Sequence, residues 1–132
     1  MNISEAARRS GLRAKTIRYY EEIGLIGEPA RRPNGYRDYD QGALEELQFL
    51  SRARQVGFDL EECRQLLDLQ RDEGRQSRHA RELVLEKSAQ LQQRIDQLQA
   101  MQQVLETLAD RCHGDEGPDC AILDDLAGGG RE

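Results

Sequence analysis

Apolar residues recur at every seventh position in residues 77–109, a long stretch that lacks glycine and proline. As a helix, this stretch would run roughly 45–50 Å at 1.5 Å per residue. The repeat places its apolar side chains along one seam, which predicts a two-stranded coiled coil between identical chains. An internal helical hairpin is disfavoured because no second helix of similar length is predicted. The seam consists of Val84, Leu91, Leu98 and Leu105, with Ile95 and Ala109 at intervening positions.

Shorter predicted helices precede and follow this stretch, and most of them end at a glycine. Asp59 precedes an apolar pattern, and Glu62 lies three residues after Asp59. This spacing predicts a capping box at the start of one helix. Residues 25–39 contain prolines and the pair Asn34-Gly35, which favours a tight hairpin, so this segment is predicted to be a wing. The predicted helices cover residues 4–9, 13–23, from Asp40 to Gly57, from Asp59 to residues 72–74, and 121–126.

The net charge of −6 is unevenly distributed over the 132 residues. Residues 1–58 carry ten basic against eight acidic side chains (+2), residues 59–108 seven against ten (−3), and residues 109–132 two against seven (−5). An acidic tail therefore leaves room for a basic N-terminal face. Residues 1–5 lack the pattern of a signal peptide and no apolar run is long enough to cross a membrane, so we expect a cytoplasmic protein.

Cations and phenolic hydroxyls gather on the second predicted helix and on the wing, the two elements of a winged helix-turn-helix that face a duplex. These groups neutralise and hydrogen-bond phosphates, so we predict binding to double-stranded DNA. The alternative is a solvated basic face whose tyrosines fill gaps in the core. The residues are Lys15, Arg18, Tyr19, Arg31, Arg32, Tyr36 and Arg37.

Two cysteines, Cys112 and Cys120, bracket a loop rich in Gly, Asp and Pro directly after the long helical stretch. Two thiolates are too few for a closed structural zinc site and suit a soft monovalent ion, so we expect Cu(I), with Ag(I) or Au(I) also accepted. The helix predicted over residues 121–126 would stabilise the Cys120 thiolate at its N-terminus. The third cysteine, Cys63, lies on an apolar helical face and is expected in the core.

Two other interpretations of the cysteine loop remain open. His113 directly follows Cys112 and, with Asp115, Glu116 or Asp119, would complete a site for a divalent ion. The two thiols would instead form a disulfide in a redox-responsive regulator. An enzyme is disfavoured because the sequence offers no nucleophile with a nearby base and no glycine-rich phosphate loop.

The motifs together resemble the MerR family of transcription regulators over nearly the whole chain. The seven-residue spacer between the two cysteines, Ser77, and the run after the loop further resemble its copper-responsive branch. The matching segments are Thr16-Ile17-Arg18-Tyr19-Tyr20-Glu21, Gly24-Leu25, Asn34-Gly35-Tyr36-Arg37, Tyr39, Ala53-Arg54-Gln55-Val56-Gly57-Phe58 and Cys120-Ala121-Ile122-Leu123.

The resemblance implies a homodimer on promoter DNA that activates RNA polymerase by distorting the DNA when metal binds, a readout through deformability. It implies that Arg18, Tyr20, Tyr36 and Arg37 hold the DNA backbone, while Lys15 reaches toward base edges. Ser77 stands where divalent sensors of the family have a cysteine supplied across the dimer, which favours Cu(I) over zinc, cadmium, lead or mercury. Ser77 and Arg81 are expected around the metal site. The DNA-binding set is Lys15, Thr16, Arg18, Tyr19, Tyr20, Arg31, Tyr36, Arg37 and Arg54.

The sequence therefore predicts a mainly α protein in three parts. Residues 1–75 are expected to form a winged helix-turn-helix DNA-binding domain with a small β wing. Residues 76–110 are expected to form the dimerisation helix, and residues 111–132 the metal-binding loop, a short helix and a tail. The predicted function is a non-enzymatic, Cu(I)-responsive transcription regulator.

Overall fold

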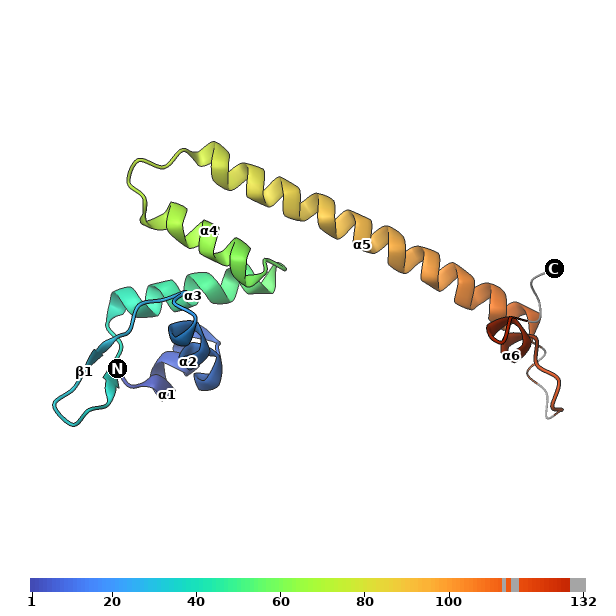
Figure 1. Cartoon of the computed structure of the whole chain (residues 1–132), viewed down its shortest axis with the longest axis horizontal. Coiled ribbons are helices and arrows are strands. Elements are labelled where there is room, and N and C mark those ends of the chain that lie inside the picture. The colour runs from blue at the N-terminus through green and yellow to red at the C-terminus, as the bar shows by residue number, and fades with distance from the viewer. Residues whose placement is uncertain (113, 115–116, 129–132) are drawn as a thin grey trace. The chain divides into compact units, whose positions relative to one another are not determined.

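The computed structural model describes residues 1–112, 114 and 117–128 and divides the chain into two compact units, Met1–Lys87 and Ser88–Glu132. The mainly helical fold with a small wing is confirmed (Figure 1). Among the described residues, no helix is long and apolar enough to cross a membrane. The elements are α1 (Ile3–Ser10), α2 (Ala14–Glu22), β1 (Ala30–Arg31), β2 (Arg37–Asp38), α3 (Gln41–Gln55), α4 (Leu60–Arg71), α5 (Ser77–Arg111) and α6 (Ala121–Leu126).

Polar side chains cap the N-termini of three helices in the first unit. The Asn2 side chain accepts a hydrogen bond from the Glu5 amide of α1 (2.9 Å), and Asp40 accepts one from the Ala43 amide of α3 (2.8 Å). At α4 the predicted capping box is confirmed, since the Asp59 and Glu62 side chains each accept the other's backbone amide at 2.8 Å. Each cap satisfies amides that have no partner within the helix, at about 1 kcal/mol per cap.

One hydrophobic core joins α1, α2, α3 and α4 to the base of the wing. Each large apolar side chain fully buried there contributes roughly 1.5–3 kcal/mol relative to exposure. Cys63 belongs to this core and is fully buried, which agrees with its sequence-based interpretation. The core residues are Ala6, Ile17, Tyr20, Leu25, Ile26, Tyr39, Leu47, Leu50, Ala53, Phe58, Cys63 and Leu67.

The wing is a two-stranded antiparallel hairpin in which Ala30 pairs with Asp38 and Arg31 with Arg37. Its loop closes through a hydrogen bond from the Arg32 amide to the Tyr36 carbonyl oxygen (2.8 Å), and Gly35 takes a φ of 85° that glycine tolerates without strain. The hairpin expected at Asn34-Gly35 is thus present.

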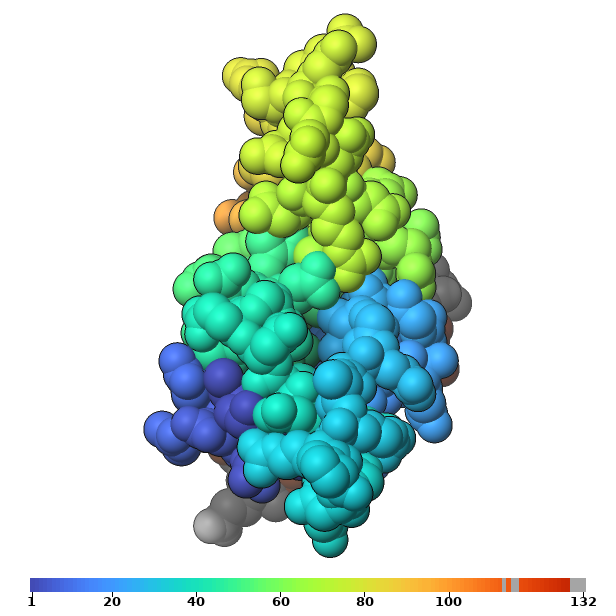
Figure 2. Space-filling model, turned by 90° about the vertical axis from the view of Figure 1, so that its left-hand side faces the viewer, coloured from blue at the N-terminus to red at the C-terminus, as the bar shows by residue number. Residues whose placement is uncertain are grey.

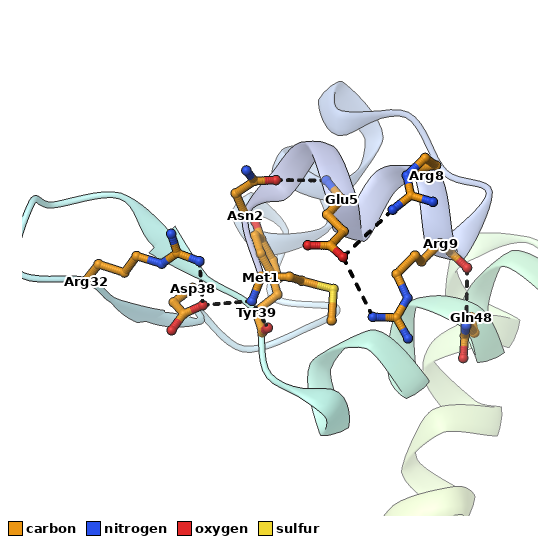
Figure 3. A network of polar contacts seen from close by, with 9 residues as sticks. All are labelled: Met1, Asn2, Glu5, Arg8, Arg9, Arg32, Asp38, Tyr39 and Gln48. Carbon is orange, nitrogen blue, oxygen red and sulfur yellow. Dashed lines mark hydrogen bonds and ion pairs between the residues drawn. The ribbon is translucent and has the colours of Figure 1, made fainter.

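Polar contacts attach the wing to the start of the chain. The Met1 ammonium donates to Asp38 Oδ1 (2.8 Å) and to the Tyr39 carbonyl oxygen (2.7 Å), while Arg32 pairs with the same Asp38 carboxylate (Figure 3). The Met1 ammonium, followed by Arg32, holds the pKa of Asp38 below its usual value. Figure 2 shows the wing and the start of the chain side by side on one face. The wing is therefore fixed at its base.

In the second unit, α5 ends at Arg111 and α6 follows the cysteine loop. Arg111 forms an ion pair with Asp125 of α6 at 2.6 Å. The predicted apolar seam of α5 lies largely in solvent in the single chain, with Leu98 56% and Leu105 63% exposed. The expected boundaries at residues 75 and 110 stay a prediction, because α5 continues without a break from one compact unit into the other.

Candidate DNA interface and metal site

Helix α2 buries one face and presents basic and phenolic groups on the other. Ile17 is fully buried, whereas Lys15 and Arg18 are exposed and Tyr19 is 46% exposed. Thr16 is half-buried. The turn before α2 depends on Gly11, whose φ of 77° ends α1, and on a hydrogen bond from the Leu12 amide to Ser10 Oγ (3.2 Å). The structure therefore places Lys15, Arg18 and Tyr19 where a ligand can reach them.

The expected DNA contact of Tyr20 stays a prediction. Its side chain is only 4% exposed and belongs to the core. The physical reason is the helical period, since Tyr20 follows Ile17 by three residues and shares its buried face. Burial raises the pKa of Tyr20, while the nearby Arg54 guanidinium lowers it by a smaller amount.

The three predicted DNA contacts of the wing differ in their exposure. Tyr36 is 72% exposed at the tip, and Arg31 is exposed with its guanidinium donating to the Gly35 carbonyl oxygen (2.9 Å). Arg37 is half-buried and its Nε lies 2.8 Å from Glu21 Oε2. Any phosphate contact by Arg37 would therefore come in addition to this ion pair.

Glu21 is the residue that the sequence-based analysis missed. Its carboxylate is buried on α2, accepts a hydrogen bond from Tyr39 Oη and pairs with Arg37. Burial and the Glu21 carboxylate raise the pKa of Tyr39 well above its usual value. The available signal was the helical period, because Glu21 follows the buried Ile17 by four residues. This junction fixes the wing against α2, and so sets the spacing of the two basic surfaces.

Arg54 lies near the end of α3, beside the turn to α4. Its side chain is exposed, and its guanidinium donates to the Phe58 carbonyl oxygen at 2.9 Å. Turn geometry therefore sets the direction of this cation. Its predicted role in DNA binding remains a prediction.

The two loop cysteines lie together in the second unit. Cys112 Sγ and Cys120 Sγ are 3.4 Å apart and both residues are half-buried. Cys112 directly follows α5, with its amide bonded to the Ala109 carbonyl oxygen (3.2 Å), and Cys120 directly precedes α6. At this separation one ion can contact both sulfurs.

The backbone of α6 favours the thiolate form of Cys120. Hydrogen bonding from the Leu123 backbone, then from the Cys112 thiol and the Ile122 backbone, lowers the pKa of Cys120 below its usual value. The pKa of Cys63 moves the other way, because burial in the core raises it. The thiols of Cys120 and Cys63 therefore differ in reactivity at neutral pH.

The described residues supply few further ligands. Within residues 1–112, 114 and 117–128, no group of three or more His, Cys, Asp or Glu side chains could hold a metal ion. The described part of the loop thus fits a two-thiolate site for a soft ion. His113, Asp115 and Glu116 lie outside the described residues, so the divalent alternative that used them stays a prediction, while Asp119 is exposed.

Comparison with known proteins fixes the family. Residues 1–70 match the model of the MerR HTH family regulatory protein and residues 44–108 match that of MerR, DNA binding. The chain belongs to the MerR family. It is 48% identical to the HTH-type transcriptional regulator CueR of Salmonella typhimurium (strain LT2), over 97% of this chain and 93% of that relative. It is 49% identical to the regulator HmrR of Rhizobium leguminosarum bv. viciae, over 98% and 99%.

A solved structure agrees with this assignment. The regulator PbrR691 from Ralstonia metallidurans CH34, crystallised in complex with lead(II), matches this MerR-family chain with a TM-score of 0.83 and 32% identity, over 96% of this chain and 98% of that one. The sequence-based expectation of a metal-responsive MerR-family transcription regulator of the CueR-like branch is confirmed at the level of family and class.

Ser77 and Arg81 lie in the first turns of α5, in the first compact unit, and both are exposed. Ser77 is the first residue of α5. The expected place of Ser77 and Arg81 beside the metal site, which the resemblance to the family implies, stays a prediction.

Thiol labelling tests the contrast between the cysteines. On brief exposure of the reduced protein to iodoacetamide at pH 7, Cys120 should be alkylated at least about tenfold faster than Cys63, because a lowered pKa and exposure both favour thiolate attack. Mass spectrometry of the labelled peptides measures each rate. Equal rates for the two cysteines in the folded protein would contradict the described environments.

Proposed function

We propose that this MerR-family regulator binds promoter DNA as a homodimer and activates transcription by RNA polymerase when Cu(I) is held by Cys112 and Cys120. The observation that carries the proposal is the 3.4 Å approach of the two sulfurs at the junction of α5 and α6. A cation there would draw two thiolates together and offset their charge. Since a promoter lies with the chromosome, the cytoplasmic expectation forms part of the proposal.

The exposed groups of α2 and the wing support the DNA contact. Lys15, Arg18 and Tyr19 face outward from α2, and Arg31 and Tyr36 from the wing. The ion pair between Arg37 and Glu21 holds these two elements together, so the basic surface is formed before DNA arrives. A preformed surface limits the ordering cost of binding.

The exposed seam of α5 supports the homodimer. Val84, Leu91, Leu98 and Leu105 recur at seven-residue spacing and range from 36% to 63% exposed in the single chain. A second copy would cover them by knobs-into-holes packing. Such a regulator carries two copies of the DNA surface, which suits a promoter with two related half-sites.

The cysteine loop is proposed to shift an equilibrium between two DNA-bound states. Cys120 directly precedes α6, and Arg111, one residue before Cys112, pairs with Asp125 of that helix. Bringing the two sulfurs to one ion therefore bears directly on how α6 packs against the end of α5. A repacked α6 would favour the dimer geometry that distorts the promoter, which is a population shift. No covalent bond of the DNA is broken in this scheme.

Metal titration tests the site. Under anaerobic conditions the reduced protein should bind one Cu(I) per chain against a competing chelator, with two sulfur ligands by X-ray absorption at the copper edge. Cys112→Ser or Cys120→Ser should weaken binding at least about a hundredfold, since either change removes one of two ligands. Cys63→Ser is the matched control and should keep the affinity. A site that prefers zinc with nitrogen or oxygen ligands would instead favour the divalent alternative.

The DNA surface is tested by charge removal. Arg18→Ala should weaken binding of the dimer to every duplex about a hundredfold and make the slope of log K against log salt less steep by about two, because each of the two chains loses one phosphate contact. Arg71→Ala, which removes a cation paired with Glu46, should leave both quantities unchanged. Fluorescence anisotropy at several salt concentrations measures them. An unchanged slope for Arg18→Ala would remove this residue from the interface.

The dimer is tested at the seam. Leu98→Lys should convert dimers to monomers, since the dimer loses two buried leucines, each contributing about 1.5–3 kcal/mol, and gains two charges. Gln93→Lys adds the same charge outside the seam and should leave the dimer intact. Analytical ultracentrifugation at micromolar concentration distinguishes the species. A Leu98→Lys dimer as stable as the wild-type one would exclude this seam as the interface.

A further inference from the structure

Lys87 of α5 lies against the turn between α3 and α4, and it is the last residue of the first compact unit. We infer that Lys87 positions this turn and its cation Arg54, and thereby transmits the state of α5 to the DNA-binding unit. The transmission rests on the function proposed above. The positioning rests on contacts within the first unit alone.

Glu62 joins two structural tasks in one side chain. Its Oε1 accepts the Asp59 amide at 2.8 Å, which caps α4, and the same atom lies 2.8 Å from Lys87 Nζ. A change in the position of Lys87 therefore acts on the first turn of α4. Because the contact is made at the cap, it acts where the helix begins rather than along its side.

The ion pair of Lys87 with Glu62 is shielded from water, unlike the pair of Arg8 with Glu5 in α1. The side chains of Lys87 and Glu62 are 12% and 16% exposed, whereas those of Arg8 and Glu5 in α1 are 74% and 44% exposed. The Lys87 ammonium also lies 5.9 Å from the centroid of the Phe58 ring, within the range of a cation–π contact. A pair with little access to water is weakly screened and fixes geometry better than an exposed one.

Phe58 connects this contact to Arg54. The Phe58 ring faces Lys87, its amide bonds to the Ala53 carbonyl oxygen (3.2 Å), and its own carbonyl oxygen accepts the Arg54 guanidinium (2.9 Å). A shift of the ring by Lys87 would move the carbonyl that directs Arg54. The steps from α5 to this exposed cation are thus direct contacts between named groups.

The first experiment measures positioning without metal or DNA. In Lys87→Met the amides of residues 56–62 should exchange with solvent at least about threefold faster than in the wild-type protein, because the turn loses its ion pair. Lys87→Arg keeps the charge and should restore slow exchange. Arg71→Met breaks the ion pair with Glu46 between α3 and α4, which does not involve α5, and should leave exchange at residues 56–62 unchanged. Unchanged exchange in Lys87→Met would overturn the positioning role.

The second experiment measures transmission. Run-off transcription is compared with and without Cu(I) on a promoter duplex selected by the wild-type chain. Lys87→Met and Glu62→Gln should each lower the fold-induction about tenfold, within the range of couplings between distant sites, while Lys87→Arg and Arg71→Met keep it. Glu62→Gln tests charge alone, since its side-chain carbonyl can still accept the Asp59 amide.

The outcomes separate the two ideas. A wild-type chain without Cu(I)-dependent transcription would defeat the proposed function, and the exchange measurement would still decide whether Lys87 positions the turn. A responsive wild-type chain whose Lys87→Met variant loses melting temperature or DNA affinity but keeps its fold-induction would reduce Lys87 to a structural residue. That result would overturn the transmission.

Discussion

The buried carboxylate of Glu21 is the constraint on which the DNA-facing part of the structure depends. A carboxylate removed from water is costly unless it is paired, and breaking such a pair typically costs about 3–5 kcal/mol. Tyr39 and Arg37 supply the partners from the end of the wing. Movement of the wing away from α2 would therefore remove both partners of this carboxylate, so one electrostatic requirement fixes two surface elements together.

Two other carboxylates of the first unit also have two partners each. Glu62 caps α4 and receives Lys87, and Asp38 receives both Met1 and Arg32. Glu62 joins α4 to α5, and Asp38 joins the wing to the start of the chain. The net negative charge of the chain is thus compatible with a basic face, because three carboxylates of the first unit, those of Glu21, Asp38 and Glu62, are paired with basic groups of the same unit.

Local sequence patterns predicted the fold well, but they could not predict ion pairs between residues that are distant in the sequence. The Asp59–Glu62 capping box, the seven-residue seam and the Asn34-Gly35 hairpin depend on neighbours within a few residues, so periodicity and turn chemistry indicate them directly. The Glu21–Arg37 and Lys87–Glu62 pairs join residues 16 and 25 positions apart. Their formation depends on how helices pack, which no local pattern contains. Tyr20 shares the buried face of Ile17, as the helical period predicts, and its expected contact with DNA stays a prediction.

Helix α6 has only six residues, well below the length of about 12–15 at which isolated helices become even marginally stable in water. Its order therefore has to come from its surroundings, among them the ion pair between Asp125 and Arg111. An element of this kind has no stability of its own to overcome. In the proposed mechanism, a free-energy change too small to rearrange the core of four helices would be sufficient to move α6. The part of the chain that responds to the ion would then be the part that is least stable by itself.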